Sequence, residues 1–376
     1  MSAAIRPPSS ALAFLERNGW AGAQVAPLAG DASFRRYFRV TDRGRTAVLM
    51  DAPPAHEDCR PFLFVADWLV ANGFAAPRLI AGDLAQGLLL IEDFGDRRMG
   101  PELAAGRADE AGVYRAAVEV LAALHRLPPP LELAPYGRDE LLREVLLFPQ
   151  WYLKAAGLAV DEAAYVAAWD AVWATAIEET ARQPVLTLRD YHADNLMLLD
   201  DGRLGLLDFQ DALAGHRAYD LVSLLQDARR DVPVRLESEM LDHFIRAGDV
   251  ADAGAFRTAY DVLGAQRNIK ILGIFVRLRD RDGDTDGILF DAMEDPHIDT
   301  FFFTQALRRI ADETLGGCLA CKGVRYLADT VGNMLALLEE NNLAFGVYAF
   351  CLTCGAGTGR QTTYDQDAFR HLFVFE

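Results

Sequence analysis

The chain has 376 residues, of which 51% are hydrophobic and 24% charged, and its formal net charge is −18. Such an acidic chain is poorly suited to nucleic acid or to anionic membrane surfaces, since both are polyanions. No uninterrupted apolar stretch approaches the ~18 residues of a membrane span. Glu16 and Arg17 interrupt the N-terminal segment, where a signal peptide needs an unbroken apolar region. We therefore expect a cytoplasmic protein with no nucleic-acid or membrane partner. We also expect a monomer.

The first 93 residues have the pattern of a small α+β lobe. A helix is predicted over 59–72, where the apolar spacing is helical and Gly73 ends the pattern. Around it, short runs of alternating apolar residues separated by turn residues predict strands. The predicted strands are 24–28, 34–40, 46–50, 78–81 and 87–92.

After Gly95 the apolar spacing changes to the 3.6-residue period of helices. A strand pair, 196–199 and 204–207, interrupts this helical part, and Asp200-Asp201-Gly202 between the strands is a strong hairpin signal. From about Asp284 the pattern becomes irregular, so three parts are expected: 1–93, 94–283 and 284–376. The predicted helices are 108–127, 138–156, 161–182, 219–230 and 260–278.

The candidate chemistry lies in two segments on either side of this hairpin, LRDYHADN (188–195) and LDFQD (207–211). Phosphoryl transfer needs a carboxylate that accepts a hydrogen bond from the attacking hydroxyl, and oxygen ligands for magnesium. Asp190 is the candidate base, and Asn195 and Asp208 are the candidate ligands, which the hairpin brings to face each other. In the alternative interpretation Asp190 and Asn195 are turn residues and Asp208 caps a helix.

These motifs resemble the aminoglycoside phosphotransferase-like kinases, and the sequence is most similar there to the anomeric kinases of N-acetylmuramate and N-acetylglucosamine. The resemblance covers about residues 10 to 283. It implies the two-lobed protein-kinase fold, with an antiparallel-sheet N-lobe and a mainly helical C-lobe, and transfer of phosphate from ATP with Mg²⁺ to a sugar hydroxyl in peptidoglycan recycling. The segments that carry it are GDASFRRYFRV (30–40), VLMDAPP (48–54), LRDYHADNLM (188–197), LLDFQDA (206–212), YDLVSLLQD (219–227) and AQRNIKILGIF (265–275).

The sequence departs from this family at Met50, which stands where most kinases of the fold have a phosphate-binding lysine. No lysine precedes Lys154. Arginine or backbone amides must then contact phosphate, and strand alternation allows only one of Arg35 and Arg36 to point into the cleft. Scattered charges on a solvated strand are the alternative. The candidate nucleotide-binding residues are Asp31, Ser33, Arg35, Arg36, Val48, Met50 and Glu92.

The candidate substrate residues are polar groups of the helical part. His192 either contacts substrate or stabilises the catalytic loop, and we favour the second role because phosphoryl transfer does not require it as an acid or base. Arg267 and Lys270 lie on an otherwise apolar helix, so they bind an acidic substrate group or belong to a polar network in the core. The candidates are His192, Asp211, Arg267 and Lys270.

Four cysteines form two Cys-x2-Cys pairs in the C-terminal part. In a reducing compartment, paired motifs of this kind fit a structural zinc ion with thiolate ligands. Buried free cysteines and redox chemistry are the alternatives. The candidate zinc ligands are Cys318, Cys321, Cys351 and Cys354.

Three functions remain in competition. The first is an ATP-dependent kinase of a small sugar, and the second is a kinase of an aminoglycoside or amino alcohol, because the catalytic motif does not encode the acceptor. The third is a nucleotide-binding pseudokinase, which Met50 and an apolar Leu188 before the catalytic aspartate would favour. Retention of Asp190 together with both candidate metal ligands argues against the pseudokinase.

Overall fold

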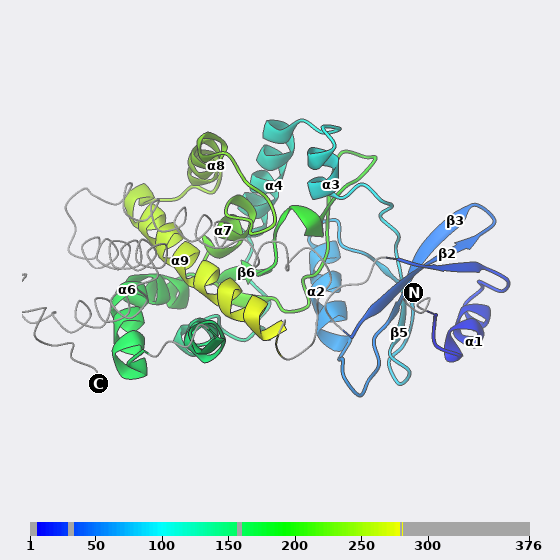
Figure 1. The fold of residues 1–376 in the computed structure, drawn as a ribbon. Coiled ribbons are helices and arrows are strands. Elements are labelled where there is room, and N and C mark those ends of the chain that lie inside the picture. The colour runs from blue at the N-terminus through cyan, green and yellow to red at the C-terminus, as the bar shows by residue number, and fades with distance from the viewer. Residues whose placement is uncertain (1–5, 29–33, 156–159, 279, 281–376) are drawn as a thin grey trace, which may run out of the picture.

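The computed structural model describes residues 6–28, 34–155, 160–278 and 280. Figure 1 shows a sheet lobe near the N-terminus and a helical lobe beyond it, with helix α2 standing between the two. The sheet is antiparallel, in the order β1-β2-β3-β5-β4. Its strands are β1 (Gln24–Pro27), β2 (Arg36–Asp42), β3 (Arg45–Asp51), β4 (Leu79–Asp83) and β5 (Leu88–Ile91).

The central strands of the sheet are buried on both faces, and strand alternation assigns each residue to one of the faces. On β5, Leu88 and Leu90 pack with helix α1 (Ser10–Arg17), whereas Leu89 and Ile91 pack on the other side with α2 (Arg60–Ala71). The core on the α2 side continues into the helical lobe. The two lobes therefore share one apolar core, and this core places α2 against the catalytic region.

The helical lobe contains helices that begin at clear signals. The side chains of Asp109, Asp161 and Asp252 each accept a hydrogen bond from a backbone amide in the first turn of α4, α6 and α9. Among the described residues, no helix is both long and apolar enough to cross a membrane. The helices are α3 (Met99–Ala104), α4 (Glu110–Leu124), α5 (Arg138–Val145), α6 (Glu162–Arg182), α7 (Tyr219–Leu225), α8 (Val234–Ala247) and α9 (Ala253–Arg277).

The helix predicted over 138–156 is divided, because α5 ends at Val145 and a π-helical turn follows over Phe148–Leu153. Pro149 has no amide proton, so it has none to donate to the carbonyl of Val145 four residues earlier. The hydroxyl of Tyr165 donates to that carbonyl at 3.0 Å instead. The proline therefore changes the helix type, and a side chain from α6 satisfies the carbonyl.

Two short strand pairs carry the catalytic segment. β6 (Val185–Thr187) pairs with β9 (Leu213–Gly215), and β7 (Leu196–Leu198) forms the predicted hairpin with β8 (Leu204–Leu206). The hairpin is bonded to the segment that follows α2, since the amide of Leu206 donates to the carbonyl of Ala75 at 2.7 Å. The predicted α+β class with a sheet lobe and a helical lobe is confirmed.

Candidate active site

The predicted catalytic residues come together where the loop between β6 and β7 meets the end of β8. The side-chain amide of Asn195 donates to the backbone carbonyl of Asp190 at 2.9 Å and to Oδ2 of Asp208 at 3.3 Å. The backbone closes the same arrangement, since the amide of Leu207 donates to the carbonyl of Asn195 at 3.0 Å. The carboxylate of Asp190 has no hydrogen bond or ion pair to another described residue. It is available to accept a hydrogen bond from a ligand.

Two residues of this site have backbone conformations that are uncommon for side-chain-bearing residues. Arg189 has φ 71° and Asp208 has φ 57°, both in the left-handed region. Strained positions of this kind persist only where the surroundings fix them, and they concentrate at functional sites. Asp208 is fixed by the side-chain amide of Gln210, whose Nε2 donates to Oδ1 at 2.9 Å. Its neighbour Phe209 is fully buried and stacks on Phe62 of α2, with ring centroids 5.2 Å apart.

His192 is buried within the catalytic loop, where its Nε2 lies 3.2 Å from the side-chain amide of Asn195. Burial, together with the positive charges of Arg229 and Arg267, lowers the pKa of this imidazole to about 3. The ring is therefore neutral near pH 7 and can accept the hydrogen bond from Asn195. This contact is consistent with the loop-stabilising role. A substrate contact by His192 stays a prediction.

The two candidate arginines at the start of β2 point to different partners. Arg36 forms an ion pair with Asp51 across the sheet. Arg35 directs its Nη2 toward Asp208, 3.7 Å from Oδ1, and its Nε lies 3.9 Å from Glu57. Burial alone would lower the pKa of Arg35, but Tyr37 and the carboxylates of Asp208 and Glu57 outweigh it and raise this pKa, so the side chain is charged. The structure thus places Arg35, and not Arg36, beside the candidate metal ligand.

The other candidate nucleotide-binding residues are less close to this centre or lie outside the described part. Met50 is fully buried in β3, with a relative exposure of 0%. Val48 is half-buried on the same strand. Glu92 is exposed where the chain leaves the sheet, and its backbone amide donates to the carbonyl of Arg78 at 2.9 Å. Asp31, Ser33 and the candidate zinc ligands Cys318, Cys321, Cys351 and Cys354 lie outside the described residues.

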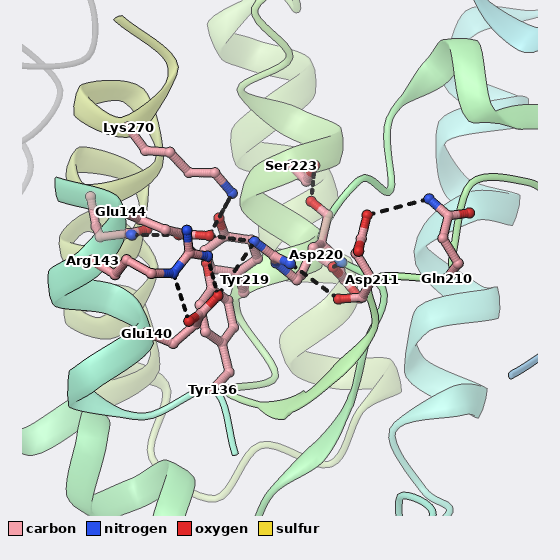
Figure 2. A network of polar contacts seen from close by, with 12 residues as sticks. Tyr136, Glu140, Arg143, Glu144, Gln210, Asp211, Tyr219, Asp220, Ser223 and Lys270 are labelled. Atoms are coloured by element: carbon pink, nitrogen blue, oxygen red, sulfur yellow. Dashed lines mark hydrogen bonds and ion pairs between the residues drawn. The ribbon is translucent and has the colours of Figure 1, made fainter. Parts of the chain in front are cut away.

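A buried polar network adjoins the catalytic loop, and Figure 2 shows it between helices α5 and α9. At its centre is Glu144, which is 1% exposed. It pairs with Lys270 at 2.9 Å and with Arg189, and accepts hydrogen bonds from Tyr136 and from Gln266. Burial alone would raise the pKa of Glu144, but Lys270 and Arg189 outweigh it and lower this pKa to about 2.

Lys270, one of the candidate substrate residues, belongs to this network. Lys270 has its counterion in Glu144, as expected of a core network. Glu144 was missed because its partners come from distant segments. The one local signal was an acidic residue on the apolar side of α5, beside the buried Leu141 and Val145.

The remaining substrate candidates differ from Lys270. Arg267 is 4% exposed, yet it forms no hydrogen bond or ion pair with the residues that the structure describes, and its Nη1 is buried without a partner there. Asp211 is exposed, and its backbone carbonyl accepts a hydrogen bond from Arg189 at 3.2 Å. The charges of Arg267 and Arg229 both lower the pKa of His192, so they lie near the catalytic loop.

Comparison with known proteins places these features in a family. The model of the phosphotransferase enzyme family matches residues 24–258. An N-acetylmuramate/N-acetylglucosamine kinase of Caulobacter vibrioides is 37% identical over 312 residues, which cover 72% of this chain and 85% of the relative.

Two solved structures share the fold at low sequence identity. Choline kinase from Cryptosporidium parvum Iowa II matches with a TM-score of 0.55 and 10% identity, over 90% of this chain and 99% of that one. The ADP-bound aminoglycoside phosphotransferase APH(2'')-Ib matches with a TM-score of 0.51 and 14% identity, over 76% of this chain and 96% of that one.

Proposed function

We propose that this chain, which belongs to the phosphotransferase enzyme family, transfers the γ-phosphate of ATP to the anomeric C1 hydroxyl of N-acetylmuramate or N-acetylglucosamine. The observation that carries the chemistry is the convergence of Asp190, Asn195 and Asp208, in which the Asp190 carboxylate has no partner among the described residues. A binding module has no evident need for such a free carboxylate. The sugar acceptor is supported by the name of the Caulobacter relative.

Asp190 would hold the acceptor hydroxyl by accepting its hydrogen bond and would take its proton late in the transfer. A hemiacetal hydroxyl is more acidic than an ordinary alcohol, so a carboxylate that mainly orients the nucleophile is sufficient. His192 is neutral near pH 7, and its contact with Asn195 fixes the loop that carries Asp190. The chain therefore supplies orientation at C1 more than basicity.

Asn195 and Asp208 fit a magnesium ion, because amide and carboxylate oxygens are the ligands that this hard cation prefers. The two side chains are neighbours, since the amide nitrogen of Asn195 lies 3.3 Å from Oδ2 of Asp208. Within the described ranges, no group of three or more His, Cys, Asp or Glu side chains could hold a metal ion. Magnesium is commonly bound by one or two protein ligands together with substrate phosphates and water. When bound, it would neutralise charge on the transferring phosphate.

Arg267 is the residue that we propose for the lactyl carboxylate, which distinguishes N-acetylmuramate from N-acetylglucosamine. Lys270 is already neutralised by Glu144, whereas Arg267 has no ion pair among the described residues. A guanidinium of this kind can form a charge-assisted, two-pronged hydrogen bond with a carboxylate. Its position on α9 near the catalytic loop is consistent with this role.

The experiment that tests the acceptor class is ADP release by the purified chain with ATP and Mg²⁺ against four acceptors: N-acetylmuramate, N-acetylglucosamine, an aminoglycoside and choline. The proposal expects turnover with the two amino sugars well above the other compounds. Turnover with the aminoglycoside or choline alone would leave a kinase but overturn the sugar acceptor. Nucleotide binding without turnover of any acceptor would favour the pseudokinase.

A further inference from the structure

The chain lacks the small-lobe lysine with which most kinases of this fold contact the nucleotide phosphates. Met50 occupies that place in β3 and is fully buried. The only lysines are Lys154, Lys270 and Lys322. Lys270 belongs to α9 and is paired with Glu144. If the sheet lobe contributes a side-chain cation to the phosphates, that cation is an arginine.

The arginines of β2 and β3 all have carboxylate partners away from the catalytic centre. Arg39 binds Asp93 through two hydrogen bonds of 2.8 and 3.0 Å, and so ties β2 to the segment between the lobes. Arg45 donates to Asp42 at 2.8 Å. Arg36 is paired with Asp51, as described above. Arg35, which immediately precedes β2, differs from these arginines because its side chain is directed toward Asp208 in the catalytic centre.

Arg35 is held in place from two sides. Its side chain is only 11% exposed and lies between Glu57, at 3.9 Å, and Asp208, at 3.7 Å. The preceding residue adds a second connection between the same segments, because Phe34 stacks on His56 with ring centroids 4.6 Å apart and an interplanar angle of 18°. Residues 34–35 therefore contact residues 56–57, in the segment that leads into α2.

We propose that Arg35 contacts the nucleotide phosphates in place of the missing lysine, and that Glu57 is its positioning partner in place of the glutamate that other kinases carry on the helix after the third strand. This inference rests on the proposed kinase function. Arg35 lies beside Asp208, the candidate metal ligand, and the phosphates that share this metal must lie next to the same carboxylate. In other kinases of the fold this ion pair joins a lysine on the third strand to a glutamate on the next helix. Here Arg35, just before β2, and Glu57, before α2, would form the equivalent pair.

The exchange of residue type has a physical consequence. A guanidinium is planar and offers several donors, so Arg35 can contact Glu57 and a phosphate oxygen with different N–H groups. A lysine at position 50 would need an acidic partner on α2, where Asp67 is the sole acidic residue. Because the lysine and its glutamate partner are both absent, neither is left as an unpaired buried charge. This arrangement accounts for a buried Met50 in an active enzyme.

The test measures equilibrium binding of ATP, ADP and adenosine by calorimetry with Mg²⁺, using the full chain and its R35A, R35K and E57Q variants. R35A is expected to weaken ATP binding by ~10- to 100-fold, the scale of a hydrogen bond to a charged group, and adenosine binding much less. R35K should recover part of the loss. E57Q should lose less affinity than R35A, and its loss should increase from adenosine to ADP to ATP. R45A, which removes an arginine paired with Asp42, is the matched control and should bind ATP normally.

A purely structural role would weaken ATP and adenosine binding equally in R35A, and that result would overturn the proposal. Normal ATP binding by R35A together with a loss in R36A would overturn it as well. If R35A does not fold, R35K and E57Q still test the proposal. It requires both variants to lose more affinity for ATP than for adenosine. These measurements use no acceptor, so they are independent of whether a sugar, an aminoglycoside or no acceptor is phosphorylated.

Discussion

The carboxylate of Asp220 accepts a hydrogen bond from the backbone amide of Leu188 at 2.6 Å. The same carboxylate accepts a second hydrogen bond from the backbone amide of Arg189 at 2.8 Å. Asp220 therefore holds the residues before Asp190 through their backbone, without help from the side chain at position 188. An apolar Leu188 packs into the core there and is compatible with a working catalytic loop.

We expect D220N to lower kcat by ~10- to 100-fold and to destabilise the fold by about 1–3 kcal/mol, because the amide nitrogen would face one of the two backbone donors. S223A removes a weaker contact of the same loop, in which Ser223 donates to the carbonyl of Arg189 at 3.1 Å, and it serves as the control. Steady-state kinetics and urea unfolding measure both effects. A fully active D220N would show that Asp220 does not position the loop.

Substitution of Asp190 and of Asp208 should affect turnover and ATP binding differently. D190N is expected to bind Mg²⁺-ATP nearly normally while its kcat falls by ~10²- to 10⁴-fold, the usual scale for a lost general base. D208N should lose both turnover and magnesium-dependent ATP binding. Kinetics combined with magnesium titrations separate the two variants. Wild-type turnover by D190N, or an unchanged magnesium dependence in D208N, would remove that residue from its assigned role.

Glu144 should be a stability determinant because two buried cations depend on it. E144Q removes the counterion of Lys270 and leaves Arg189 with only its longer, 4.0 Å ion pair to Glu140. Loss of one partner of a buried ion pair typically costs about 3–5 kcal/mol. D139N is the control on the same helix, since Asp139 is fully exposed, pairs with Arg138 and lies outside the network, so it should change the stability little. Thermal and urea unfolding of the two variants test this difference, and equal stabilities would contradict it.

The same residue predicts a pH dependence. The pKa of Glu144 is about 2 in the folded chain and near 4.5 when unperturbed, so its stabilising contribution is fully present above pH 4.5 and is lost as the pH falls toward 2. E144Q should lack this component. Urea unfolding from pH 6 down to 3 measures it, and parallel curves for wild type and E144Q would contradict the assignment.

Arg267 should determine preference between the two amino sugars. We expect R267Q to lower the ratio of kcat/KM for N-acetylmuramate to that for N-acetylglucosamine by ~10- to 100-fold, the scale of a lost charge-assisted hydrogen bond. R257Q removes an arginine from the same helix that is paired with Asp242 near the surface, and the ratio should stay unchanged. If R267Q lowers both kcat/KM values equally, Arg267 has a structural role.

The parts of the fold that sequence predicted well have strong local signals. The strand pattern of the sheet lobe and the hairpin at Asp200-Asp201-Gly202 depend on alternation and turn residues, and both were confirmed within about two residues at most ends. Other elements were missed for physical reasons. Strands β6 and β9 have three residues each, too few for a period to show. Helix α8 was also missed, although it follows Pro233.

The candidate site divides in the same way. The proximity of Asn195 and Asp208 could be predicted because a single hairpin connects them. Which of Arg35 and Arg36 lies beside Asp208 could not be predicted, since their positions depend on partners in other segments, Asp208 for Arg35 and Asp51 for Arg36. Long-range packing of this kind leaves no local pattern.

The central claim is phosphorylation at the anomeric carbon, and phosphorus NMR of the product formed from ATP and N-acetylglucosamine or N-acetylmuramate tests it most directly. The account predicts a single sugar 1-phosphate, whose phosphorus couples to the anomeric proton, and no such signal with D190N. A phosphate on C6, or no turnover of either sugar beside robust phosphorylation of an aminoglycoside, would contradict it.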